Sequence, residues 1–66
     1  MSPQRFSIRL RQIRERRGMT LEALAEKAGV SRAYLSRLEM GRHDPPLSRL
    51  RKLAKVLKVP IEKLLK

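Results

Sequence analysis

Cysteine and asparagine are absent from this chain of 66 residues. Without cysteine it can form no disulfide, thiolate nucleophile or cysteine-based zinc site. No apolar run approaches the roughly 20 residues that cross a membrane, and the stretch from Met1 to Arg5 lacks the apolar segment of a signal peptide. We therefore expect a protein that stays in the cytoplasm and has no membrane partner.

Acidic residues are also scarce, because 6 Asp and Glu stand against 17 Lys and Arg, a formal net charge of +11. This excess is larger than solubility requires, and such dense charge repels itself in the folded state. A polyanion is the partner that the charge favours, because its negative groups would relieve the repulsion.

The length of the chain limits the kind of site it can build. A domain of this size buries only about 60% of the surface of its unfolded form, so we expect a small core and no deep catalytic cleft. The single histidine and the scattered carboxylates form neither a metal-ligand cluster nor a nucleophile–base pair. We expect one domain over residues 1–66 that is not an enzyme and uses no metal or cofactor.

Apolar residues recur at helical spacing, and strand alternation is nowhere sustained, so the predicted fold class is all-α. Thr20 and Ser31 can cap helices, and glycines can end them. The first three expected helices cover about residues 6–17, 21–28 and 32–40, and they end at Gly18, Gly29 and Gly41.

Prolines make residues 42–46 a loop, because each proline lacks an amide donor and restricts the residue before it. A fourth helix follows, with an apolar stripe formed by Leu47, Leu50, Ala54 and Leu57. Pro60 fits the first turn of a short fifth helix. The apolar side chains of this last helix suit either the core or a small self-complementary patch; they are Ile61, Leu64 and Leu65.

The inward faces of the first four helices predict one hydrophobic core. Its expected members are Leu10, Ile13, Leu24, Ala25, Val30, Leu35, Leu38, Leu50, Leu53, Ala54 and Leu57.

The most specific pattern lies between Met19 and Gly41. A small residue, Ala25, precedes a turn at Gly29, which suits two short helices that cross steeply. The runs MTLEALAEKAGVS (residues 19–31) and YLSRLE (residues 34–39), followed by Gly41, resemble the phage repressor/Cro-type helix-turn-helix family. The resemblance covers residues 6–65. It implies a compact, five-helix, lambda-repressor-like DNA-binding domain with its helix-turn-helix at about residues 20–40.

The third expected helix has two faces, because each residue advances about 100° around the axis. Leu35 and Leu38 lie on one face, and polar or small residues lie on the other. The resemblance makes this the recognition helix in the major groove, with four candidate base readers: Arg32, Ala33, Ser36 and Arg37. Without the resemblance, an ordinary solvated face would explain the same residues.

The resemblance also implies contacts that hold the domain on the DNA backbone. The candidate phosphate-contacting residues are Thr20, Tyr34, Arg42 and His43. For Tyr34, packing at the rim of the core explains the residue as well as a phosphate contact does. For His43, a solvated position explains it as well as a contact with the DNA backbone. Arg14 and Glu39 match a family pair that forms a partly buried salt bridge, whose expected role is to orient the third helix.

Three positions depart from the family pattern. Leu21 stands where many members place a glutamine directed at phosphate, and Met40 stands where an asparagine commonly precedes the glycine. Backbone N–H groups at the start of the second helix can still meet a phosphate. Lys58 stands where a glycine is usual, which predicts that the fourth helix ends without a left-handed cap.

These features together imply a transcriptional regulator, most simply a repressor, that binds double-stranded DNA at the nucleoid. The family resemblance implies a homodimer on a palindromic operator with half-sites about 34 Å apart and no small-molecule substrate. The alternative is a protein-interaction module of the same fold, such as a coactivator bridge or an antitoxin, because a basic face also suits an acidic protein. The sequence is equally consistent with a fragment of a longer regulator.

The charge predicts how affinity for duplex DNA depends on salt. Each phosphate neutralised by Lys or Arg releases counterions, so a plot of log affinity against log salt should have a slope of about −0.9 per phosphate. Fluorescence anisotropy of a labelled duplex at several salt concentrations measures this slope. A slope near zero would contradict DNA binding by the basic surface.

Overall fold

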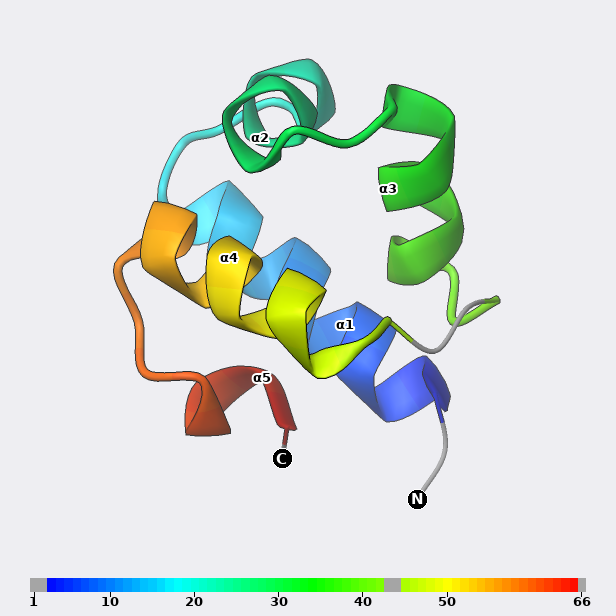
Figure 1. Ribbon diagram of the computed structural model, residues 1–66, viewed down its shortest axis with the longest axis vertical. Coiled ribbons are helices and arrows are strands. Elements are labelled where there is room, and N and C mark those ends of the chain that lie inside the picture. Colours follow the sequence, from blue (N-terminus) through cyan, green and yellow to red (C-terminus); the bar gives the residue numbers. More distant parts are fainter. Residues whose placement is uncertain (1–2, 43–44, 66) are drawn as a thin grey trace.

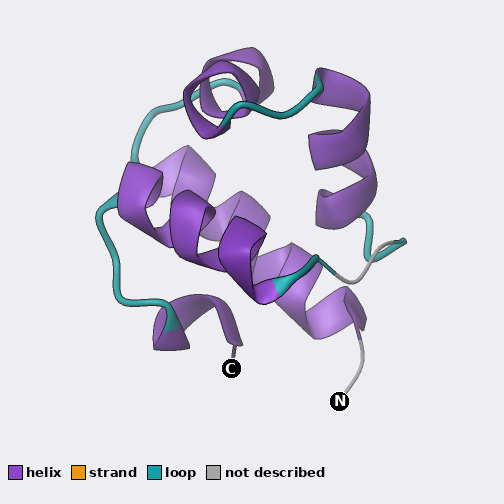
Figure 2. Ribbon diagram, viewed as in Figure 1, coloured by secondary structure: helices purple, strands orange, loops and turns teal. Residues whose placement is uncertain are grey.

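The computed structural model describes residues 3–42 and 45–65, and this part of the chain contains helices and no strand (Figures 1 and 2). The helices are α1 (Pro3–Arg16), α2 (Leu21–Ala28), α3 (Arg32–Glu39), α4 (Leu47–Leu57) and α5 (Glu62–Leu65). The predicted all-α class with five helices is therefore confirmed. None of the helices in the described part is long and apolar enough to cross a membrane.

Two hydroxyl side chains fix the starts of α2 and α3. The amide N–H of Ala23 donates to Thr20 Oγ1 at 3.0 Å, and the amide N–H of Tyr34 donates to Ser31 Oγ at 3.0 Å. A helix leaves its first amide groups without partners inside the helix, and these oxygens each satisfy one of them. The caps predicted at Thr20 and Ser31 are confirmed.

The turn between α2 and α3 depends on Gly29, which has a left-handed backbone with φ of 71°. A side chain makes this conformation costly, whereas glycine adopts it freely. The next amide, that of Val30, donates back to the carbonyl of Ala25 at 3.0 Å and closes the end of α2. The chain can therefore change direction within two residues, and α3 runs steeply across α2 (Figure 1).

The core lies where all five helices meet, and its buried members are Leu10, Leu24, Ala25, Ala28, Leu35, Leu38, Leu50, Leu53, Ala54, Leu57 and Leu64. Most of the predicted core is confirmed. Ile13 and Val30 are the exceptions, because both are only partly buried and pack against the edge of the cluster. Of the two alternatives left open for the last helix, Leu64 packs in the core, because it is fully buried. The side chain of Leu65 lies outside the described residues.

Several helix ends differ from the expected bounds. The first helix begins at Pro3, three residues before the expected start, because proline suits the first turn of a helix. The third ends at Glu39, one residue early, and Met40 has φ of −90° and ψ of 1°. Pro60 precedes α5 and is not part of its first turn, but its carbonyl accepts a hydrogen bond from the amide of Lys63 at 3.0 Å.

The prediction of no left-handed cap after α4 is wrong. Lys58 has φ of 59° and ψ of 43°, and the amide of Val59 donates to the carbonyl of Ala54 at 3.0 Å, as in a glycine-ended helix. Arg17 Nη2 also donates to the carbonyl of Lys58 at 3.1 Å. These hydrogen bonds hold a conformation that lysine alone disfavours.

Replacement of Lys58 by glycine should stabilise the fold. Lys58→Gly removes the unfavourable contact of Cβ in the left-handed conformation and should raise the free energy of unfolding by about 0.5–1 kcal/mol. Lys55→Gly is the matched control, because it removes the same charge from the helix itself and should lower the free energy of unfolding by about 1 kcal/mol. Urea unfolding followed by circular dichroism measures both, and the same sign for both variants would contradict the prediction.

Candidate nucleic-acid interface

The helix α3 has one buried and one exposed face. Leu35 and Leu38 have no exposed surface, whereas Arg32, Ala33 and Arg37 are exposed and Ser36 is half-buried. The buried face packs against α1 and α2, so two helices hold α3 from behind. The four candidate base readers therefore share the outward side of one short helix.

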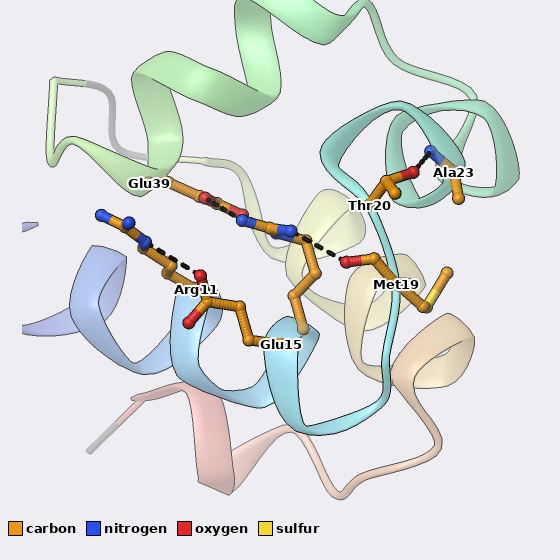
Figure 3. A network of polar contacts seen from close by, with 7 residues as sticks. Arg11, Glu15, Met19, Thr20, Ala23 and Glu39 are labelled. Atoms are coloured by element: carbon orange, nitrogen blue, oxygen red, sulfur yellow. Dashed lines mark hydrogen bonds and ion pairs between the residues drawn. The ribbon is translucent and has the colours of Figure 1, made fainter.

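A buried ion pair joins α3 to α1. Arg14 Nε donates to Glu39 Oε2 at 2.7 Å, and Arg14 Nη2 donates to Glu39 Oε1 at 3.1 Å. The same guanidinium donates through Nη1 to the carbonyl of Met19 at 2.8 Å. In Figure 3 the dashed lines of these bonds end at the labelled Glu39 on one side and Met19 on the other. The pair expected from the sequence is thus present as a two-pronged contact, with a third bond to the turn before α2.

The surroundings of Arg14 favour its charged form. Its side chain is 12% exposed and that of Glu39 is 9% exposed. The hydrogen bond to Glu39 raises the pKa of Arg14 above its ordinary value, although burial acts in the opposite direction. Arginine is already protonated at any physiological pH, so this side of the bridge does not titrate in the range where the protein works.

A second ion pair lies at the surface, where α2 and α3 both begin. Arg32 Nη1 donates to Glu22 Oε2 at 2.9 Å, with 67% of the Arg32 side chain and 62% of the Glu22 side chain exposed. One candidate base reader is therefore paired with a carboxylate of the neighbouring helix.

The candidate phosphate-contacting residues lie around α3. Thr20 is exposed at the start of α2, and Arg42 is exposed just after the end of α3. Tyr34 is partly buried against the core, and the guanidinium of Arg49 from α4 lies over its ring, 5.2 Å from the ring centre. His43 lies outside the described residues.

Two of the departures from the family pattern have distinct structural settings. Leu21, at the first position of α2, is partly buried and packs against the core, so it adds apolar contact where other members carry a polar side chain. Met40 follows the last residue of α3 and is 55% exposed. Nowhere in the described part do three or more His, Cys, Asp or Glu residues gather as a metal site would require.

Sequence reasoning missed two residues that the fold brings to α3: Glu22 and Arg49. Glu22 is ten residues before Arg32, and Arg49 is 15 residues after Tyr34. Neither separation corresponds to neighbours on one helix, where side chains three or four residues apart meet. No signal in the sequence alone would have found these contacts, because they depend on how the helices cross.

A capped helix, a left-handed glycine turn and a second helix with an outward basic face define a helix-turn-helix domain. A model described as helix-turn-helix matches residues 10–64 of the chain. The chain belongs to the phage repressor/Cro-type helix-turn-helix family.

Named relatives support this assignment. The transcriptional repressor RghR of Bacillus subtilis is 43% identical over 61 residues, which are 91% of this chain and 45% of that protein. The restriction-modification controller protein C.AhdI of Aeromonas hydrophila has a TM-score of 0.91 and 32% identity, with 94% of each chain covered. SinR of Bacillus subtilis, solved in complex with DNA, has a TM-score of 0.88 and 39% identity, with 92% of this chain and 98% of that chain covered.

The chain spans about half the length, or less, of most of the curated relatives that it matches. The similarity therefore concerns the helix-turn-helix domain and not the remainder of those longer proteins.

The burial of the Arg14–Glu39 pair predicts a large loss of stability when one partner is removed. Arg14→Ala or Glu39→Ala should each lower the free energy of unfolding by about 3 kcal/mol, because an unpaired charge would remain in a largely buried site. Thermal and urea unfolding measure this loss.

Arg11 and Glu15 provide a matched control within α1. Their contact is 3.4 Å long, and their side chains are 65% and 55% exposed. Arg11→Ala and Glu15→Ala should each change the free energy of unfolding by less than about 0.5 kcal/mol. Equal losses for the buried and the exposed pair would show that the Arg14–Glu39 bridge does not hold the fold.

Proposed function

We propose that this chain binds double-stranded DNA sequence-specifically and regulates transcription, most simply as a repressor that occupies an operator. The observation that carries the proposal is the exposed face of α3, where Arg32, Ala33 and Arg37 lie opposite two fully buried leucines. A net charge of +11 supplies the attraction to the DNA backbone. The solved complex of SinR with DNA supports the same use of this domain. The proposed role is binding and requires no enzymatic step.

The dimensions of α3 suit the major groove of DNA. An α-helix with its side chains is about 10–12 Å across, and the groove is about 12 Å wide, so α3 can lie in it. In this pose Arg32 and Arg37 donate two hydrogen bonds each to guanine O6 and N7, and Ser36 donates to or accepts from a base edge. The methyl group of Ala33 contacts the methyl group of thymine.

The phosphate contacts flank this helix. The Thr20 hydroxyl accepts from Ala23 within α2, and its own O–H remains able to donate to a phosphate. The backbone N–H groups at the start of α2 favour an anion in the same place, in spite of Leu21. Tyr34, Arg42 and His43 make the remaining contacts, and Arg49 holds the Tyr34 ring by a cation–π contact.

The buried pair keeps the reading helix in place. Glu39 is the last residue of α3, and its two bonds to Arg14 tie that end of the helix to α1. A small displacement of α3 would move every base-reading side chain together, so this pair orients the interface without touching DNA.

We further propose that the protein acts as a homodimer on a palindromic operator, with half-sites about 34 Å apart and with each α3 in successive major grooves. Such a protein works where the DNA is, at the nucleoid in the cytoplasm. Size-exclusion chromatography with light scattering, on the protein free and on its selected duplex, measures the stoichiometry.

The alternative function is a protein-interaction module that holds an acidic partner. The relatives reported above are regulators, and one is solved on DNA. A gel-shift titration with random duplex and with an acidic protein at matched salt separates the two functions. Tighter binding of the acidic protein would favour the alternative.

Arg37 and Arg42 provide a direct test, because they are the same residue type in opposite proposed roles. Arg37→Ala should cost about 1–3 kcal/mol on a duplex selected from a random pool and should relax the preference at one base pair. Arg42→Ala should weaken binding to all duplexes alike and reduce the salt slope by about one unit.

The measurement compares both variants on the selected duplex and on a scrambled duplex at several salt concentrations. If Arg37→Ala weakens both duplexes equally while Arg42→Ala removes the discrimination between them, the proposed placement of α3 in the groove is wrong.

A further inference from the structure

We propose that Glu22 determines the base preference of Arg32, a positioning role outside the recognition helix that rests on the DNA-binding function proposed above. The structure places the carboxylate of Glu22 in the first turn of α2 and the guanidinium of Arg32 at the first position of α3. Arg32 Nη1 and Glu22 Oε2 are 2.9 Å apart.

Stability alone is a poor explanation for this pair. Its side chains are 67% and 62% exposed, and exposed ion pairs contribute little to folding because water screens both charges. The same exposure leaves the pair open to DNA at the N-terminal end of α3, where recognition helices contact base edges. As DNA approaches and excludes water, the attraction between the two charges becomes stronger.

The bond to Glu22 restricts how Arg32 can present itself to a base. A guanidinium is planar and carries five N–H donors in a fixed geometry. With Nη1 committed to Glu22, the edge formed by Nε and Nη2 remains, and this edge carries two parallel donors. Guanine offers two acceptors at matching spacing, O6 and N7, in the major groove. The pair therefore presents one edge of Arg32 in a held orientation.

The carboxylate also penalises the other bases. Glu22 cancels the charge of Arg32, so the paired arginine adds little to the attraction for phosphates in general. A carboxylate has only acceptor oxygens, which phosphate oxygens repel. Only a base that accepts from both donors of the Nε–Nη2 edge compensates for the carboxylate at the interface. The carboxylate therefore makes discrimination sharper at the cost of affinity.

Glu26 is a matched control in the same helix. It is exposed, stands one turn after Glu22 in α2, and forms no ion pair with any residue in the described part of the chain. Glu22→Ala and Glu26→Ala therefore remove the same charge and the same side chain from one helix. Thermal unfolding of both variants separates a loss of helix stability near the N-terminus of α2 from an effect on recognition.

The experiment uses the full chain and a duplex selected from a random pool by the wild-type protein. Arg32→Ala identifies the base pair whose preference is lost, and four duplexes that differ only at that pair serve as probes. Dissociation constants are measured for the wild type, Glu22→Ala, Glu26→Ala, Arg32→Ala and the double variant Glu22→Ala with Arg32→Ala.

Glu26→Ala should tighten binding to all four duplexes alike, because it only adds net positive charge. Glu22→Ala should tighten binding mainly to the duplexes without guanine and reduce the preference by about fivefold, in the range expected for coupled neighbours. In the Arg32→Ala background, removal of Glu22 should leave the preference unchanged.

Three outcomes would overturn the inference about Glu22 while leaving DNA binding intact. The first is an equal preference for Glu22→Ala and Glu26→Ala. The second is an effect of Glu22→Ala on the relative affinities for the four duplexes that is as large in the Arg32→Ala background as in the wild type. The third is no loss of preference at any base pair in Arg32→Ala. A wild-type protein that enriches no duplex from the pool would overturn the proposed function and this inference with it.

Discussion

The guanidinium of Arg14 joins α1 to the turn that follows it and to the end of α3, 25 residues further along the chain. It binds both oxygens of Glu39 at the end of α3 and the carbonyl of Met19 in the turn before α2, and it does so from α1. The pair is largely buried, so removal of either partner would leave the other charge uncompensated in a site with little water. These bonds fix the C-terminal end of α3 against α1, while the burial of Leu35 and Leu38 fixes which face of α3 points outward.

The domain uses the same chemistry at two depths for two purposes. The Arg14–Glu39 bridge is about one-tenth exposed, and the Arg32–Glu22 bridge is about two-thirds exposed. Burial makes the first bridge a structural tie, because little water is available to solvate either charge if the pair is broken. Exposure leaves the second bridge accessible at the start of α3, where it adds little to stability. Of the few acidic residues in the chain, Glu39 is the last residue of α3, and Glu22 of α2 binds the first residue of α3.

Most of the fold follows from local chemistry. Thr20 and Ser31 each cap a helix through an amide only three residues away, and Gly29 adopts a backbone that other residues avoid, so both features can be read from neighbouring letters. Helical spacing of leucines likewise predicted most of the core. Lys58 shows the limit of such rules: it takes the left-handed conformation expected of glycine, and Arg17, 41 residues earlier, donates a hydrogen bond to its carbonyl.

The sequence by itself therefore determined the number of helices, most ends of the first three to within one residue, the core face of α3 and the pair of residues expected to orient it. It also indicated which side chains face outward on α3, because the angle per residue in a helix is constant. Only the tertiary structure decided what those side chains meet. Glu22 reaches Arg32, and Arg49 reaches Tyr34, because of the angles at which α2, α3 and α4 cross. Those angles are set by the packing of the whole core, which no local pattern encodes.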